Sequence, residues 1–156
     1  MAHRRTRSAL ACGALAVAAF APTAAADSVY HSEHLRFAPV AGAPLRSGFV
    51  ENIKAEGPRV YAHEVFVLNG ALPRTTYTVS RNLFPFDPDC SGENGVFTSA
   101  VGNLRTNAVG NAQDDTKVTP EEVAGFEGVH GVRWTVVQNA TGALVYRTGC
   151  TAVTLD

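Results

Sequence analysis

The stretch that decides the fold is Leu72-Pro73-Arg74-Thr75-Thr76-Tyr77-Thr78-Val79. Pro73 has a fixed φ and no N–H to donate to a sheet, so it suits a corner of the chain. The residues from Thr75 to Val79 are all β-branched or aromatic, and such side chains favour strands. The stretch therefore predicts a bend that leads directly into a strand.

Short strands separated by turn residues are predicted on both sides of this corner. The expected strands before it cover 29–37, 48–55 and 60–68, and the extended pieces after it cover 96–101 and 103–109. The strand that ends before Asn69-Gly70 is the most apolar, and we expect it to pair with the strand after Pro73. A polar loop is expected at 110–115.

A short helix and a closing hairpin follow. Thr119-Pro120-Glu121-Glu122 has a threonine N-cap, a proline at the first helical position and a glutamate three residues after the cap. The hairpin strands are expected at 131–138, with Val132, Trp134 and Val136 on one face, and at 143–148, with Leu144 and Tyr146 on one face. Residues 150–155 form a last strand or continue the previous one.

Seven to eight short strands with no long helix predict an all-β fold, an antiparallel Greek-key β-sandwich. The pattern Leu72-x-x-Thr75-x-Tyr77-x-Val79 resembles the E–F corner of immunoglobulin-like and fibronectin type III sandwiches. The resemblance implies that Leu72, Pro73 and Tyr77 form a structural corner. In it the tyrosine ring is buried and its hydroxyl bonds to the upstream backbone.

Residues 1–26 predict a secretory signal peptide. They contain the basic residues Arg4, Arg5 and Arg7, an apolar run at 9–20 and the small-residue site Ala24-Ala25-Ala26. An uncleaved anchor is the alternative, for which the apolar run is short. We therefore expect one domain, residues 27–156, that is secreted or kept in the cell envelope and has no membrane span in its mature form.

Cleavage of this leader changes the charge and the cysteine content. Without its three arginines the chain has 10 Lys and Arg against 14 Asp and Glu, a formal charge of −4, which argues against nucleic acid as a partner. Cys12 leaves with the leader, so Cys90 and Cys150 predict one disulfide. Two free thiols are the alternative.

A second set of motifs occurs in a recognisable order. It comprises Leu72-Pro73, the loop cysteine Cys90, Val101-Gly102-Asn103-Leu104, Gly110-Asn111-Ala112 and Gly149-Cys150-Thr151-Ala152-Val153. This order is similar to that of the copper/zinc superoxide dismutases. The resemblance implies the scaffold alone, because the strand at 76–81 lacks that family's His-x-His copper ligands and no histidine lies between 90 and 125.

Four histidines are the candidates for an alternative copper or zinc site: His31, His34, His63 and His130. On a strand His31 and Glu33 share a face and His34 points to the other, which makes a chelating trio awkward. For His63 we expect a core or edge position with its hydrogen bond satisfied. The sequence itself therefore predicts no metal and no cofactor.

Function is expected on the loops of the scaffold. The loop from Phe84 to Gly95 combines aromatic and acidic side chains and is the predicted binding loop, with candidate residues Phe84, Phe86, Asp87, Asp89 and Glu93. No nucleophile elbow or other catalytic motif is present in the sequence. We therefore expect a non-enzymatic extracellular or cell-envelope module that binds an extracellular protein or an envelope component, or that has a structural role.

Overall fold

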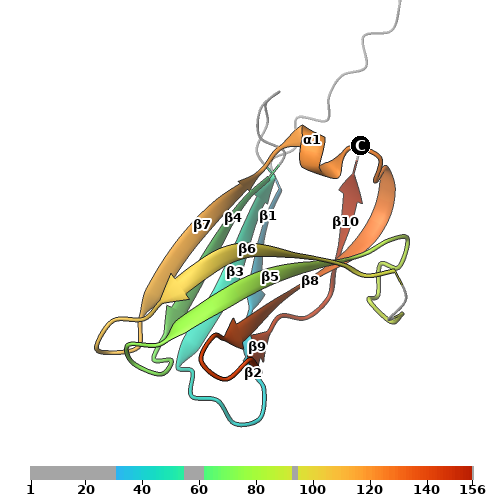
Figure 1. The fold of residues 1–156 in the computed structure, drawn as a ribbon. Helices are drawn as coiled ribbons and strands as arrows, with labels where there is room; N and C mark the ends of the chain where they lie inside the picture. Colours follow the sequence, from blue (N-terminus) through green and yellow to red (C-terminus); the bar gives the residue numbers. More distant parts are fainter. Residues whose placement is uncertain (1–30, 55–61, 93–94, 156) are drawn as a thin grey trace, which may run out of the picture.

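The computed structural model describes residues 31–54, 62–92 and 95–155, so the predicted signal peptide lies outside the described residues. Within these ranges the chain forms ten strands and one short helix, and every strand pair is antiparallel (Figure 1). In this part of the chain no helix has the length and apolar character that crossing a membrane requires. The predicted all-β antiparallel class is confirmed, with more strands than the seven to eight expected.

The first sheet has the strand order β1-β3-β4-β7. Its strands are β1 (His31–Arg36), β3 (Ser47–Lys54), β4 (Ala62–Asn69) and β7 (Ala112–Val118). Strict alternation in β4 buries Ala62, Glu64, Phe66 and Leu68 on one face, as period-2 patterning requires. That face is apolar except for Glu64.

The second sheet has the order β2-β9-β8-β5-β6, and β10 also pairs with β8. Its strands are β2 (Ala38–Pro39), β5 (Thr76–Phe84), β6 (Phe97–Arg105), β8 (Gly128–Gln138), β9 (Ala143–Arg147) and β10 (Thr151–Leu155). β9 pairs with the second half of β8 and β10 with the first half, so β10 continues the edge that β9 begins.

The two sheets enclose one hydrophobic core. Fully buried side chains reach it from β3 and β4 on one side and from β5 and β8 on the other, including Val50, Phe66, Val79 and Trp134. Two polar contacts join the sheets at their edges. The Thr151 hydroxyl contacts both carboxylate oxygens of Glu33 at 3.0 and 2.9 Å, and the backbone N–H of Asn103 donates to Asp114 at 2.7 Å.

The predicted corner is formed in part. Leu72 and Pro73 lie in the turn before β5, and the ring of Tyr77 is fully buried. The expected bond from the Tyr77 hydroxyl to the upstream backbone is wrong, because within the described ranges this hydroxyl has no hydrogen-bond partner. The carbonyl of Leu72 instead accepts from the hydroxyl of Thr106 at 2.6 Å. A different tyrosine reaches back along the chain: the Tyr146 hydroxyl donates to the Pro44 carbonyl at 2.7 Å.

The expected pairing of the strands on either side of Pro73 is also wrong. β4 lies in the first sheet and β5 in the second, so this corner carries the chain from one layer to the other (Figure 1). Residues 96–101 and 103–109 are not two pieces either. They contribute to the single strand β6, whose register shifts where Val79 and Ser80 of β5 meet it.

Two further expectations fail for local reasons. The predicted polar loop at 110–115 is largely β7, whose acidic residues suit the solvent-exposed edge of a sheet. Leu144 and Tyr146 do not share a face. A register shift where β8 residues Val136 and Val137 meet β9 leaves Leu144 exposed and Tyr146 fully buried. Val132, Trp134 and Val136 are all buried on the core side, as predicted.

The predicted helix and disulfide are both confirmed. The helix is α1 (Pro120–Val123), which links the end of β7 to β8. Cys90 and Cys150 form the disulfide, with a Cα–Cα distance of 5.9 Å. Because Cys90 follows β5 and Cys150 precedes β10, the bond joins two segments attached to the second sheet and does not clamp the two sheets together.

Candidate ligand-binding cavity

A cavity of about 200 Å³ lies between the two sheets, with α1 contributing to its wall. Most of its lining is apolar and comes from both sheets and from the segment after α1: Leu83, Val118, Phe126, Val132, Val153 and Leu155. The exposed lining residues Phe97, Ser99 and Glu122 lie on β6 and α1, so the cavity opens to solvent on that side. The remaining polar residues of the lining face inward and come from three strands: Asn52 from β3, Glu64 from β4 and Arg81 from β5.

The first sheet contributes two polar side chains at one level of the cavity. Asn52 of β3 lies directly opposite Glu64 of β4 in the antiparallel register. Directly opposed side chains in such a pair have Cβ atoms roughly 5 Å apart, so Asn52 and Glu64 are within reach of one bound group. Glu64 is only 2 % exposed, which is unusual for a carboxylate.

The second sheet contributes a matching row. Arg81 of β5 lies opposite Trp134 of β8 on one side and opposite Ser99 of β6 on the other. All three residues line the cavity, and Trp134 is almost completely buried. Asn52 and Glu64 of the first sheet thus face Arg81 and Trp134 of the second sheet across the cavity.

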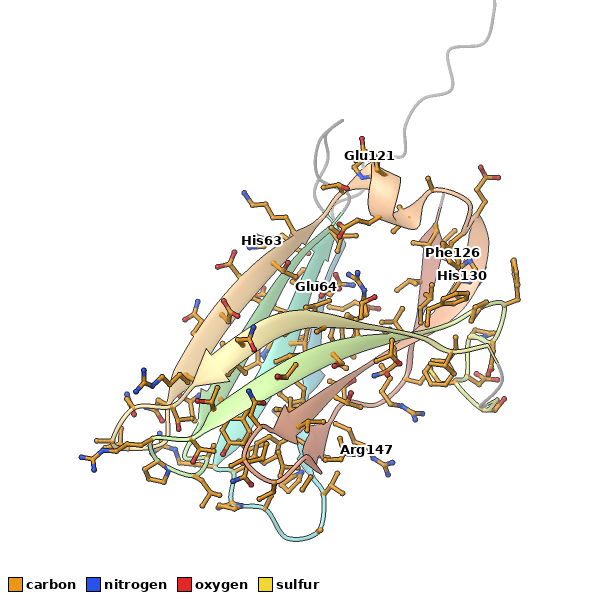
Figure 2. The ribbon with its side chains drawn as sticks, in the orientation of Figure 1. His63, Glu64, Glu121, Phe126, His130 and Arg147 are labelled. Atoms are coloured by element: carbon orange, nitrogen blue, oxygen red, sulfur yellow. A yellow bond between two sulfur atoms is a disulfide. The ribbon has the colours of Figure 1, made fainter. Side chains whose placement is uncertain are left out.

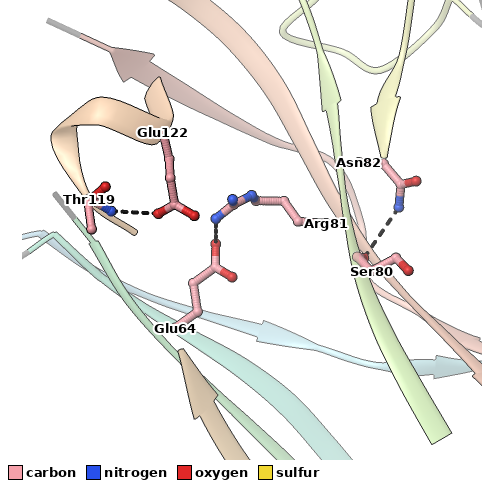
Figure 3. A network of polar contacts seen from close by, with 6 residues as sticks. All are labelled: Glu64, Ser80, Arg81, Asn82, Thr119 and Glu122. Carbon is pink, nitrogen blue, oxygen red and sulfur yellow. Dashed lines mark hydrogen bonds and ion pairs between the residues drawn. The ribbon is translucent and has the colours of Figure 1, made fainter. Parts of the chain in front are cut away.

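An ion pair joins the two rows across the cavity. A terminal guanidinium nitrogen of Arg81 donates to Oε1 of Glu64 at 2.9 Å (Figure 3). The two side chains are 19 % and 3 % exposed respectively. Removing two charges from water costs several kcal/mol per ion, and their attraction offsets this only when the other polar atoms of the pair also find partners.

Three buried polar atoms of residues that line the cavity lack such partners. Oε2 of Glu64, Oδ1 of Asn52 and Nε1 of Trp134 make no hydrogen bond to any residue in the described ranges. An unsatisfied buried polar group costs about 1 to 3 kcal/mol, and proteins rarely tolerate several together. The cavity therefore combines an apolar wall with a polar end whose buried atoms are only partly satisfied by hydrogen bonds.

The segment that contains α1 covers this polar end. The backbone N–H of Thr119 donates to Oε2 of Glu122 at 2.7 Å, which is half of a capping box. In Figure 3 the Glu122 carboxylate points toward the guanidinium of Arg81, so a second acidic group faces the same cation as Glu64. Val123 and Phe126 of this segment add apolar surface to the cavity.

His130 holds the covering segment in place. It is fully buried on β8, and Figure 2 shows it next to Phe126. The backbone N–H of Phe86 donates to Nδ1 of His130 at 3.2 Å, and Nε2 lies 3.0 Å from the carbonyl of Phe126. Since Nδ1 accepts, we assign the imidazole proton to Nε2, which then donates to Phe126.

No protein-family model, curated protein or solved structure significantly matches this chain.

The predicted binding loop lies beside this site without lining the cavity. Phe84 is buried at the end of β5, and the guanidinium of Arg133 lies 5.4 Å from its ring centre. Phe86 is 74 % exposed, and its ring centre lies 4.9 Å from that of His130. Asp87 accepts a hydrogen bond from the N–H of Gly92 at 2.7 Å. This hydrogen bond is the main reason why the pKa of Asp87 lies below its ordinary value. Asp89 is exposed, and Glu93 lies outside the described residues.

The histidine candidates occupy separate positions. His34 is exposed on β1 with its ring centre 4.2 Å from that of Phe49, and His31 begins the same strand. His63 lies on the outer face of β4, neither in the core nor at an edge, and Nε2 contacts Asp115 at 2.9 Å (Figure 2). Among the residues that the structure describes, no three His, Cys, Asp or Glu side chains form a group that could hold a metal ion.

No sequence motif points to Asn52, Glu64, Arg81 or Trp134 as site residues. A signal for two of them was present. Glu64 interrupts the apolar alternation of β4, and Arg81 does the same on the inner face of β5 after Tyr77 and Val79. A single charge on each of two otherwise apolar strand faces indicates a buried ion pair or a site.

Proposed function

We propose that this chain is a secreted, non-enzymatic binding module that holds a small, mainly apolar molecule in the cavity between its two sheets. The molecule would lie against the apolar wall of this cavity. Its export is an expectation from the predicted leader. An extracellular or cell-envelope location fits a protein that takes up a small molecule from its surroundings.

The observation that carries this proposal is the mainly apolar cavity, which has the buried ion pair of Glu64 and Arg81 in its lining. One oxygen of the Glu64 carboxylate bonds Arg81 and the other has no partner among the described residues, although the side chain is almost fully enclosed. Small-molecule sites typically combine an apolar lining with a few convergent polar groups, and this cavity has that composition. A purely structural ion pair is better stabilised when both carboxylate oxygens are bonded.

The cavity volume limits the size of the ligand. An engineered cavity of about 150 Å³ accommodates benzene, so a cavity of about 200 Å³ accommodates roughly eight non-hydrogen atoms. A molecule of this size is much smaller than a drug-sized ligand or a peptide. We therefore test the proposal with six-carbon probes.

The test is an NMR titration of the ¹⁵N-labelled protein with 1-hexanol. We expect amide shifts at the cavity strands β4, β5 and β8, and their loss in Val153→Phe, which fills the cavity from β10. Val137→Phe is the matched control, because this valine is similarly half-buried but does not line the cavity. Absence of saturable shifts with every six-carbon probe, or equal binding by Val153→Phe, overturns the proposal.

A further inference from the structure

A groove of about 480 Å³ lies on the surface where the chain leaves the first sheet for the second. Among the described residues it shares no lining residue with the cavity between the sheets. More than half of its lining is exposed, so the groove is open to a dissolved molecule: His34, Arg36, Pro39, Arg46 and Ser47. The rest of the lining is buried or half-buried and forms an apolar floor: Phe37, Leu45, Gly48 and Phe49.

The charged side chains that line this groove are basic. Arg36 and Arg46 line it together with the imidazole of His34, and no aspartate or glutamate in the described ranges does so. Neither guanidinium makes a hydrogen bond or an ion pair with a described residue. Glu51 lies opposite His34 on β3, but it accepts from the hydroxyl of Ser32 at 3.3 Å and does not line the groove. The groove is therefore a positive site without a counter-charge.

The backbone holds both arginines in fixed positions. Arg36 ends β1, and the next residue, Phe37, donates its N–H to the carbonyl of Gly48 at 2.9 Å. The N–H of Arg46 donates to the carbonyl of Asn69 at 2.9 Å, directly before β3 begins. Binding of an anion therefore has to order two side chains and not the backbone that carries them, which lowers the entropic cost of binding.

Phe49 of β3 places an aromatic ring beside the basic side chains. It is directly opposite Arg36 in the register of β1 and β3, so the two Cβ atoms are roughly 5 Å apart. Its ring centre lies 4.2 Å from that of His34. Arg46 comes three residues earlier in the chain, a span of at most about 11 Å. Because arginine side chains are long, both guanidinium groups are within reach of one anion beside the Phe49 ring.

The donors of the groove select an oxyanion. A guanidinium presents parallel N–H donors that match two oxygens of a carboxylate or a phosphate. Like charges that gather without a counter-charge repel one another, and a bound anion removes this repulsion. A cationic ligand would meet only positive charge. The apolar floor favours an anion carried on an apolar body over a small inorganic ion, because only the former buries apolar surface there.

We infer that this groove is a second binding site, for a small organic anion with a carboxylate or phosphate group on an apolar body. The anionic group accepts hydrogen bonds from Arg36 and Arg46, and the body lies against Leu45 and Phe49. The volume of the groove falls within the range of about 300 to 1,000 Å³ that small-molecule sites have. This site lies outside the cavity between the sheets and does not depend on the proposed function.

The test is an NMR titration of the ¹⁵N-labelled protein at neutral pH and low salt with benzoate, phenyl phosphate, benzamide and acetate. We expect saturable shifts at the end of β1 and the start of β3 with the two aromatic anions, and the tighter of the two identifies the anionic group. Benzamide lacks the charge and acetate lacks the ring, so both should bind at least about fivefold more weakly. No saturable shifts with either aromatic anion, or equal binding by benzamide or acetate, overturns the inference. The titration with 1-hexanol decides the proposed function separately.

Two variants check the assigned arginines. Arg36→Gln and Arg46→Gln change exposed positions, and we expect each to weaken benzoate binding about fivefold and to leave benzamide binding unchanged. Arg105→Gln, at an exposed position of β6 outside the groove, removes the same charge and should leave benzoate binding unchanged. An equal loss in all three variants would show attraction to the net charge alone and overturn the site. Unchanged benzoate binding in Arg36→Gln and Arg46→Gln also overturns it.

Discussion

Arg81 and Glu64 lie 17 residues apart on strands of different sheets, and their side chains meet at 2.9 Å inside the molecule. Removing one partner of a buried pair leaves an uncompensated charge. We therefore expect Glu64→Met or Arg81→Met alone to lower the free energy of unfolding by about 3 to 5 kcal/mol, measured by urea denaturation.

The double variant Glu64→Met/Arg81→Met should behave differently. Apolar side chains of similar size in place of a buried pair are often neutral or stabilising by about 1 to 4 kcal/mol. We expect the double variant to be at least as stable as the natural chain. A double variant as unstable as the singles would show that the pair is needed for the fold itself.

Gly131 packs against the disulfide. A Cβ atom added there would lie 2.8 Å from Sγ of Cys90 and 3.2 Å from Sγ of Cys150, and would collide with the backbone carbonyl of Asp87. We expect Gly131→Ala to lower the free energy of unfolding by about 1 to 3 kcal/mol. Gly149→Ala has open space around the added atom and should change stability by less than about 0.5 kcal/mol.

Asp87 should make the disulfide loop sensitive to acid. Its pKa is held below the ordinary value of 3.8, chiefly by the N–H of Gly92, so the ionised form is favoured in the folded state. The resulting stability is present above pH 3.8 and is lost as the pH falls through the folded pKa. We expect Asp87→Asn to be the less stable protein at pH 6 and the difference to shrink below pH 3.

The control for this experiment is Asp89→Asn in the same loop, since Asp89 is exposed. Its stability should follow that of the natural chain over the whole pH range. A stability difference between Asp87→Asn and the natural chain that persists unchanged at low pH would contradict the role assigned to Asp87.

His130 connects the disulfide loop with the segment that covers the cavity, through Phe86 on one side and Phe126 on the other. His130→Phe keeps the shape but leaves both backbone groups unpaired. We expect a loss of about 2 kcal/mol in stability and faster hydrogen exchange at the Phe86 amide. His63→Phe removes only a contact with the exposed Asp115 and should cost less than about 1 kcal/mol.

The two buried tyrosines should respond differently to loss of the hydroxyl. Tyr146→Phe removes a hydrogen bond to the Pro44 carbonyl and should lower the free energy of unfolding by about 1 kcal/mol. The Tyr77 hydroxyl has no hydrogen-bond partner in the described ranges, so Tyr77→Phe should leave the stability unchanged. Burial of the side chain holds the pKa of Tyr146 well above its ordinary value. Stability should therefore fall as the pH rises above 10, where an unfolded tyrosine ionises.

The sequence predicts those parts of the fold that a single local pattern determines. The alternation of Val132, Trp134 and Val136 gave the buried face of β8, and the two cysteines of the predicted mature chain gave the disulfide. β6 and β9 were misread because each contains a register shift, which moves side chains to the other face without a marker in the sequence. β7 was missed because it is a charged edge strand and resembles a loop.

The cavity could not be predicted from sequence patterns, for a different reason. Period-2 alternation places Glu64 and Arg81 each on an inner face. Whether they meet depends on how the two sheets are set against one another. The packing of the whole core determines that arrangement, and no segment of the sequence encodes it alone.

The contact between Glu33 and Thr151 has a consequence for how the domain is made. These residues are 118 positions apart, and they join the strands at one side of the two sheets. A chain emerging from a ribosome cannot close that side until residue 151 has appeared. That side of the domain must therefore stay open until then, and such high contact order predicts folding in milliseconds to seconds.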